Sequence, residues 1–338
     1  MPLTDLPLAE LQAYRPDVAE PADFDAFWAE TLTEARAFDL ALTAEPVANR
    51  LALIDTYDLT FAGYGGTPVR AWLHVPAGTT EPLPTVVQYH GYSRGRGLPH
   101  SDTLWAQAGY AHVVLDTRGQ GWAVGGASET ADASTEAGLS HSPGFMTAGI
   151  LDPRTYYYRR VYVDALRLLD AVRECALTDE RRVVVTGGSQ GGGLAIAAAG
   201  LAPLAGVPLL GAAPDVPFLC HFERALEIAD SPPYTEIVQY LAGWRHHAEA
   251  AYRTLSYVDG VNLGRRAEVP ALFSVALMDP VCPPSTVYAA FHHWGTAGGG
   301  TGPDKEIRVY PHNQHEGGGG YQLEVQLDWC AGLFAAAG

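Results

Sequence analysis

Ser189 lies in the sequence Gly187-Gly188-Ser189-Gln190-Gly191, between a valine-rich apolar run and an alanine-rich segment. This G-x-S-x-G spacing at the junction of a strand and a helix is typical of a nucleophile elbow. Glycines are expected there because a Cβ would collide with the adjacent strand or helix. A plain tight turn is the alternative, whereas a Walker-type phosphate loop is excluded because no lysine follows the glycines. The pattern therefore predicts that Ser189 is a catalytic nucleophile.

A serine hydroxyl needs a base to remove its proton and a carboxylate to orient that base. In parallel-sheet serine hydrolases the acid and then the histidine follow the serine along the chain. Asp279 comes directly after an apolar run in "MDPVCPP", and His315 follows the last such run in "YPHNQHEGGGG". We therefore predict a triad of Ser189, Asp279 and His315. The alternatives left open are His312 for the base and, for the orienting acid, Asp215, Asp304 and Glu306.

Acyl transfer also needs hydrogen-bond donors aimed at the developing oxyanion. The main-chain N–H of Gln190, directly after the nucleophile, is the first candidate. The loop "YHGYSRGRG" follows an earlier apolar run, and there we predict the Tyr92 main-chain N–H as the second donor. The side chains of His90 and of Arg118, which follows the next apolar run, are expected to be structural.

Short apolar runs alternate with helical patterns along most of the chain. Such alternation predicts an α/β fold with a mostly parallel central β-sheet covered by helices on both faces. The first two runs are separated by "AGYGG", which predicts a hairpin. The expected strands lie within 51–61, 67–76, 84–90, 110–116, 182–188, 207–217, 270–280 and 305–312, and the expected helices within 21–38, 99–108, 156–175 and 321–336.

The same patterns predict the domain organisation. Residues 1–45 are expected to form an N-terminal helical extension, and residues 46–338 a single catalytic domain. Residues 120–154 are rich in glycine, serine and threonine and too long for an ordinary crossover, so they predict an interaction loop or a disordered one. Residues 215–265 are helical and aromatic, which suits a small cap over the site.

The composition narrows the class of protein. With 338 residues, 47% hydrophobic and 17% charged, the chain can bury a sizeable core. A net charge of −17 argues against nucleic acid or an anionic membrane as a partner. The N-terminus has no signal-peptide pattern, and no apolar stretch approaches the roughly 18 residues of a membrane helix. The scattered cysteines predict reduced thiols in a cytoplasmic protein, with no metal or other cofactor.

Three short motifs carry a family resemblance. "RGQG" from 118, "GGSQGG" from 187 and "HE" at 315 resemble the signature motifs of the acetyl xylan esterase and cephalosporin C deacetylase group, carbohydrate esterase family 7. The resemblance extends through "DSPPYTEIVQYL" and "MDPVCPPSTVYAA" and covers nearly the whole chain. It implies an α/β-hydrolase fold and a serine carboxylesterase that removes acetyl groups from small esters, such as acetylated xylo-oligosaccharides and cephalosporin C-like compounds.

The resemblance also implies roles for single residues. It places Ser189, Asp279 and His315 in the triad, in agreement with the prediction made above from the order and positions of these residues. It implies that Tyr92 and Gln190 supply the hydrogen-bond donors to the oxyanion. It also places Tyr92 and Pro233 in a tight substrate pocket. From the signature motifs, Arg118, Gln120 and Glu316 are expected to be structural residues near the site.

Family members are typically cytosolic hexamers, which implies a homo-oligomer assembled through residues 120–154. This chain departs from the family pattern at Asn313 and Gln314, where a glycine and a histidine are common. These two differences bear on the predicted width of the acyl pocket and on the predicted oligomer contacts, but not on the predicted triad. The rival functions are a serine amidase or aminopeptidase, an acyltransferase and an inactive binding protein.

Overall fold

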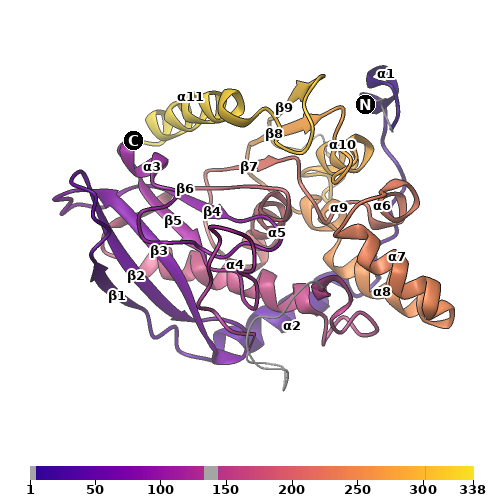
Figure 1. Cartoon of the computed structure of the whole chain (residues 1–338), viewed down its shortest axis with the longest axis horizontal. Helices are drawn as coiled ribbons and strands as arrows, with labels where there is room; N and C mark the ends of the chain where they lie inside the picture. Colours follow the sequence, from indigo (N-terminus) through magenta and orange to yellow (C-terminus); the bar gives the residue numbers. More distant parts are fainter. Residues whose placement is uncertain (1–4, 133–143, 301) are drawn as a thin grey trace.

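The structure is a computed structural model that describes residues 5–132, 144–300 and 302–338. At its centre is a nine-stranded sheet in the order β1-β2-β3-β5-β4-β6-β7-β8-β9 (Figure 1). The pairs from β1 to β5 through β2 and β3 are antiparallel, and the pairs from β5 to β9 are parallel. The strands are β1 (Thr43–Val47), β2 (Ile54–Ala62), β3 (Pro68–Pro76), β4 (Leu83–Tyr89), β5 (Ala111–Leu115), β6 (Thr178–Gly188), β7 (Gly211–Asp215), β8 (Ala271–Ala276) and β9 (Lys305–Tyr310).

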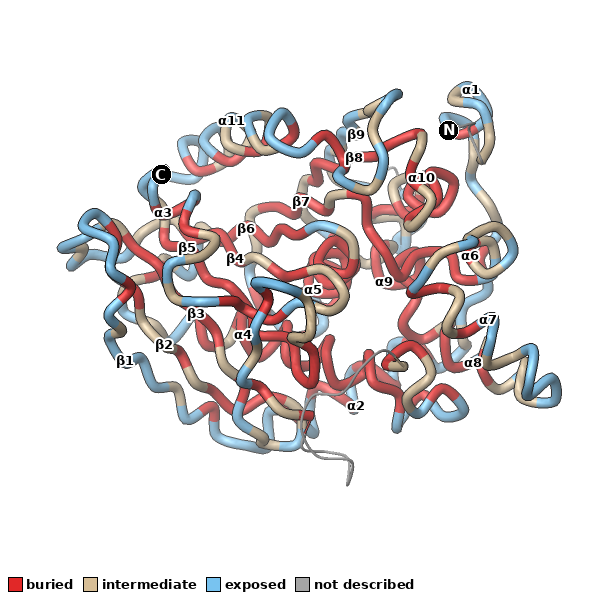
Figure 2. Tube along the Cα trace, in the orientation of Figure 1, coloured by how far each residue is buried: buried red, intermediate tan, exposed pale blue. Residues whose placement is uncertain are grey.

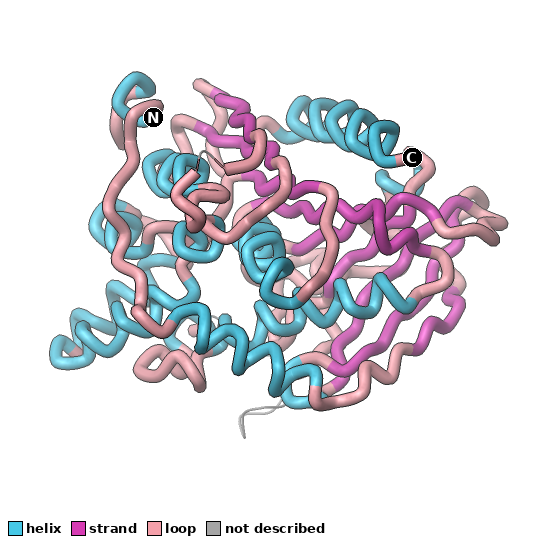
Figure 3. Tube along the Cα trace, turned by 180° about the vertical axis from the view of Figure 1, so that it is seen from behind, coloured by secondary structure: helices cyan, strands magenta, loops and turns pink. Residues whose placement is uncertain are grey.

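Helices cover both faces of this sheet, so the predicted α/β architecture is confirmed (Figures 1 and 3). The helices α2, α4 and α5 pack together on one face, whereas α3 and α11 contact the sheet on the other. The helices are α1 (Leu8–Leu11), α2 (Phe24–Arg36), α3 (Leu104–Gln107), α4 (Tyr157–Glu174), α5 (Gln190–Ala205), α6 (Phe222–Ile228), α7 (Tyr234–Gly243), α8 (Ala248–Val258), α9 (Gly260–Gly264), α10 (Pro284–His293) and α11 (Gly319–Ala337), with short 3-10 turns η1 (Tyr64–Gly66), η2 (Phe145–Thr147) and η3 (Arg245–His247).

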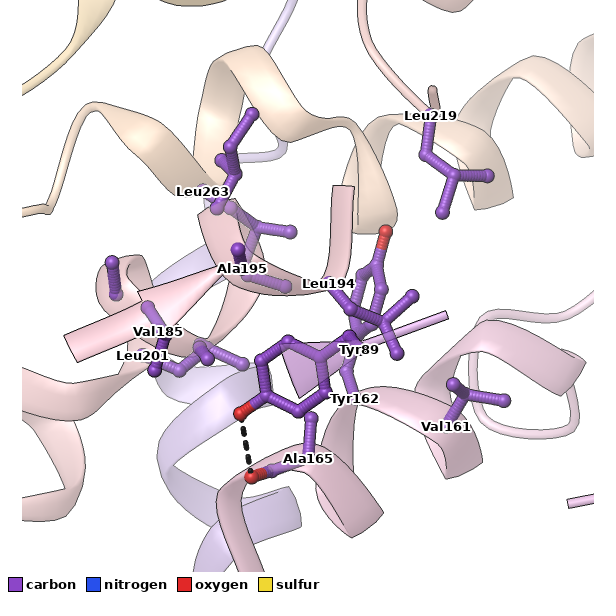
Figure 4. Close-up of a cluster of buried hydrophobic side chains, with 14 of the residues drawn as sticks. Tyr89, Val161, Tyr162, Ala165, Val185, Leu194, Ala195, Leu201, Leu219 and Leu263 are labelled. Carbon is purple, nitrogen blue, oxygen red and sulfur yellow. Dashed lines mark hydrogen bonds between the residues drawn. The ribbon is translucent and has the colours of Figure 1, made fainter. Parts of the chain in front are cut away.

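The central strands are buried on both faces because their side chains alternate between two cores (Figure 2). In β6, Val183 and Val185 join the larger core with α4 and α5, while Val184 joins the smaller core with α3 and α11. Figure 4 shows the larger core, in which the Tyr89 hydroxyl donates to the Ala165 carbonyl oxygen at 3.2 Å. This hydrogen bond ties strand β4 to α4.

Two sequence expectations differ from the structure. The helix expected within 99–108 is only the four residues of α3, because the backbone before it turns through Asp102 with φ of 49°. The extension expected over 1–45 ends in strand β1, which pairs with β2 along its length. Four of the five residues of β1 are exposed, so this edge strand has no apolar pattern and is held by main-chain pairing.

The expected cap region holds α6 to α9, and α7 and α8 project beyond the end of the sheet (Figure 1). Of the segment 120–154, residues 133–143 lie outside the described residues, so its role as an oligomer interface stays a prediction. Among the described residues, no helix is long and apolar enough to span a bilayer.

Three buried histidines lie close to the central strands: His74 in β3, His112 in β5 and His90 directly after β4. His74, His90 and His112 are each at most 4% exposed, and each has one ring nitrogen without a hydrogen-bond partner. Burial lowers the pKa of all three, that of His74 to about 4. Asp102, whose carboxylate lies 3.6 Å from His90 Nε2, opposes this effect only in part. The folded protein therefore holds neutral imidazoles here.

We expect this cluster to make the fold acid-sensitive. Below the ordinary histidine pKa of 6.5 the unfolded chain binds protons that folded His74 takes up only near pH 4. Stability is therefore lost as the pH falls through that window, by about 3 kcal/mol from His74 alone. Thermal denaturation of His74→Gln, against wild type and the exposed His312→Gln, should show a flatter dependence on pH between about 4 and 7. An identical pH profile for all three proteins would contradict this account.

Candidate active site

The elbow is formed where β6 ends and α5 begins. Ser189 has φ of 58°, in the left-handed region, so the backbone reverses sharply at this residue. A Cβ on Gly187 would lie 2.5 Å from the Tyr89 carbonyl oxygen, and one on Gly191 would collide with the same oxygen. Gly188 differs, because a Cβ there would meet nothing within 4 Å. The close approach of β4 thus explains the glycines at two of the three positions.

Three side chains from separate loops meet at the carboxyl ends of the strands. His315 Nε2 lies 2.9 Å from Ser189 Oγ, and His315 Nδ1 lies 2.9 Å from Asp279 Oδ2. The other oxygen of Asp279 accepts from the main-chain N–H groups of Val281 and Cys282, at 2.8 and 3.0 Å. In this arrangement Nδ1–H donates to the carboxylate and Nε2 accepts from the serine hydroxyl, which suits transfer of the serine proton to His315.

The alternative residues do not join this group. His312 is exposed, and Asp304 and Glu306 are exposed before and within β9. Asp215 is the nearest rival, but its carboxylate accepts from Gln322 Nε2 at 2.8 Å and Gln326 Nε2 at 2.6 Å. Burial raises the pKa of Asp215 to about 7. A carboxyl with so high a pKa is a poor partner for a histidinium.

Gln190 and Gln120 join the elbow to the loop that carries Tyr92. Gln190 Nε2 donates to the His90 carbonyl oxygen at 3.2 Å, and its Oε1 accepts from Gln120 Nε2 at 2.8 Å. Gln120 Oε1 in turn accepts from the Ser93 main-chain N–H at 2.7 Å. The two glutamines therefore hold His90 and Ser93, which flank Gly91 and Tyr92, against the first turn of α5. This is where the two predicted oxyanion donors lie, and their catalytic role stays a prediction.

Arg118 lies below this network, fully buried. Its guanidinium donates to both oxygens of Asp164, at 2.5 and 2.7 Å, and lies 3.4 Å from Asp132. Burial alone would lower the pKa of Arg118, but Asp164 and Asp132 together outweigh it and raise that pKa, so the charge persists in the interior. The Arg118 carbonyl oxygen accepts from the Tyr157 hydroxyl at 2.6 Å. The contacts of Arg118 are thus those of a structural residue two positions from Gln120.

A cavity of about 660 Å³ opens above Ser189 and His315. Pro233, Glu316 and Trp122 lie in its wall, and the role of Pro233 in an acyl pocket stays a prediction. Glu316 accepts from Asn313 Nδ2 at 2.8 Å and from the Gln314 N–H at 3.0 Å, which closes the turn that presents His315. The departures from the family pattern at 313 and 314 thus lie in this turn.

Comparison with known proteins identifies the family of this chain. The sequence model of the family described as acetyl xylan esterase (AXE1) matches residues 1–333. The chain belongs to this family. The resemblance to carbohydrate esterase family 7 and the α/β-hydrolase fold are therefore confirmed.

Two solved members of the acetyl xylan esterase family are similar over almost their whole length. An acetyl xylan esterase from Paenibacillus sp. R4 is 40% identical with a TM-score of 0.86, covering 97% of this chain and 99% of that one. Acetyl xylan esterase 1 from Thermoanaerobacterium sp. JW/SL YS485 is 30% identical with a TM-score of 0.85, covering 98% and 99%. Acetyl esterase Axe7A from Xylanibacter ruminicola is 27% identical over 318 residues, 89% of this chain, which spans 65% of the length of that relative.

Glu236 is a residue of the site that the sequence did not single out. It lies on α7, and its two carboxylate oxygens accept from the Tyr92 hydroxyl at 3.0 and 3.1 Å. The Phe145 N–H donates to the Tyr92 hydroxyl at 3.2 Å, and the Met146 N–H to Glu236 at 3.4 Å. Glu236 therefore joins the cap, η2 and the Tyr92 loop. Its only sequence signal was its place within "DSPPYTEIVQYL", and the contact itself is tertiary.

We expect Glu236→Gln to lower kcat/KM for p-nitrophenyl acetate by about tenfold, because a weaker acceptor loosens the Tyr92 loop. Tyr92→Phe removes the same hydrogen bond, so the double variant should lose little more than either single variant. Steady-state kinetics of the four proteins measures this coupling. Additive losses would mean that the two side chains act independently.

Proposed function

We propose that this protein is a serine carboxylesterase that removes acetyl groups from small esters. The observation that carries the proposal is the continuous hydrogen-bonded line from Ser189 through His315 to Asp279, at the floor of an open cavity. Membership of the acetyl xylan esterase family supports an acetyl ester as the substrate. The donor and acceptor order of the line is the one that nucleophilic catalysis by serine requires.

In the proposed mechanism Ser189 Oγ attacks the ester carbonyl carbon while His315 Nε2 accepts the hydroxyl proton. The negative charge on the carbonyl oxygen is stabilised by the main-chain N–H groups of Tyr92 and Gln190. The C–O bond to the alcohol then breaks, and His315 returns the proton to the leaving oxygen. A water molecule, deprotonated by His315, attacks the acetyl-enzyme and releases acetate and free Ser189.

The proposed substrates are acetylated xylo-oligosaccharides and cephalosporin C-like acetates. The cavity is wide enough for a sugar-sized alcohol, and Pro233 is proposed to limit the acyl side to short chains. We further propose a cytoplasmic homo-hexamer assembled through residues 120–154. All four cysteines are free, which suits a reducing compartment.

The test is steady-state hydrolysis of p-nitrophenyl esters from acetate to octanoate. Highest kcat/KM on acetate, followed by release of acetate from acetylated xylo-oligosaccharides and cephalosporin C, supports the proposal. A maximum at longer chains would contradict the short acyl pocket. Faster hydrolysis of peptide amides, or acetyl transfer to added alcohols in preference to water, would favour the amidase or the acyltransferase.

A further inference from the structure

Cys282 brings a thiol to the triad. It is the third residue after Asp279 in the turn that follows β8, and its side chain is fully buried. Cys282 Sγ, a ring nitrogen of His315 and a carboxylate oxygen of Asp279 all lie within 4.8 Å of one another. The proposed ester hydrolysis uses no thiol, so this grouping is left unexplained by the mechanism.

The three ligand atoms match the preferences of zinc and its heavier congener cadmium. Zn²⁺ binds thiolate sulfur at about 2.3 Å and imidazole nitrogen or carboxylate oxygen at about 2.0–2.2 Å, mostly with tetrahedral geometry. Ligand atoms around one such ion are then about 3.4 to 3.8 Å apart. Atoms that already lie within 4.8 Å of one another can therefore enclose an ion after small side-chain shifts. Ser189 Oγ or a water molecule is available as a fourth ligand.

Of the three residues, His315 lines the open cavity. The His315 side chain is 31% exposed and lines the cavity with Ser189, whereas the Asp279 side chain is fully buried behind it. The Asp279 carboxylate and the net charge of −17 both favour a cation at this position. His315 thus lies between the open cavity and the two buried ligands, Asp279 and Cys282.

We propose that Asp279, Cys282 and His315 form an inhibitory site for a thiophilic divalent cation such as Zn²⁺ or Cd²⁺. The ion binds the sulfur, one imidazole nitrogen and a carboxylate oxygen, and the thiol proton is released to solvent. A neutral imidazole has one lone pair, so His315 cannot accept the Ser189 proton while the ion holds that pair. The inhibitory effect rests on the proposed esterase function, but the binding of the ion does not.

The first experiment is a Zn²⁺ titration of p-nitrophenyl acetate hydrolysis, with each variant expressed relative to its own metal-free rate. Wild type and Cys175→Ala, which changes a thiol far from this turn in sequence, should show the same half-inhibiting concentration, and a chelator should restore activity. Cys282→Ala should raise that concentration by about tenfold or more, since even the loss of an outer-shell partner costs a metal site that much. Equal inhibition of wild type and Cys282→Ala would overturn the proposal.

The second experiment does not depend on catalysis. Cd²⁺ added to wild type or to Ser189→Ala should give the ultraviolet charge-transfer absorption of a Cd²⁺–thiolate bond, and Cys282→Ala should lack it. Cys282→Ser, which is nearly isosteric, takes the place of the alanine variant if that protein does not fold. Absorption that persists without Cys282 would place the ion elsewhere. If the esterase function were wrong, the absorption would still depend on Cys282, so the two failures can be told apart.

Discussion

Ser189→Ala is expected to lower kcat for p-nitrophenyl acetate by about 10⁴- to 10⁶-fold. The alanine removes the only atom of residue 189 that can bond to the acyl carbon, while the backbone of the elbow, with its φ of 58°, can be retained. Hydrolysis that remains would come from binding and the oxyanion donors alone. The measurement is kcat at saturating substrate, on protein whose circular dichroism matches that of wild type.

Ser231→Ala is the matched control for this variant. The Ser231 hydroxyl donates to the Pro280 carbonyl oxygen at 2.9 Å, next to the turn of Asp279, and has no hydrogen bond to His315. It should keep kcat within a few-fold of wild type. Wild type should also release a burst of one p-nitrophenol per active site, which Ser189→Ala lacks. A burst in Ser189→Ala would assign the nucleophile to another residue.

Asp279→Asn is expected to lower kcat by about 10⁴-fold with little change in KM. The Asp279 carboxylate accepts the Nδ1–H of His315 and thereby leaves the Nε2 lone pair facing Ser189. An asparagine amide donates to Nδ1 instead, which puts the ring proton on Nε2 and removes the base. The loss should therefore be in the chemical step, as seen in kcat and in the rate of the burst.

Asp215→Asn tests whether Asp279, rather than Asp215, is the acid that orients His315. Asp215 is a partly buried carboxyl at the end of β7, but its partners are Gln322 and Gln326 rather than His315. We expect its kcat to fall by less than about tenfold, since no contact with the proton-transfer line is lost. If Asp215→Asn were the slower enzyme of the two, the orienting acid would be Asp215.

The local features of this protein follow from its sequence. The elbow could be predicted from the sequence because its parts are consecutive in the chain. A strand pattern, the glycines Gly187 and Gly191 around Ser189 and a helix pattern follow one another directly. The positions of Asp279 and His315 directly after apolar runs were equally visible, because the carboxyl ends of parallel strands share one edge of the sheet. Weak local signals failed: β1 has an exposed, unpatterned sequence, and α3 is shorter than its surroundings suggested.

Only the tertiary structure decided which of the candidates meet. His315 and Ser189 are 126 residues apart in the chain, and Glu236 and Tyr92 are 144 apart. No periodicity or motif spacing reports a side-chain contact across such distances, since the contact depends on the twist and order of β4 to β9 and on the packing of the cap. The sequence showed four scattered cysteines without metal-ligand spacing, whereas folding placed one thiol, Cys282, beside the imidazole and carboxylate of the triad. The sequence determines the residue types and much of the local backbone conformation. The reactivity of a side chain also depends on its spatial neighbours, which only folding brings together.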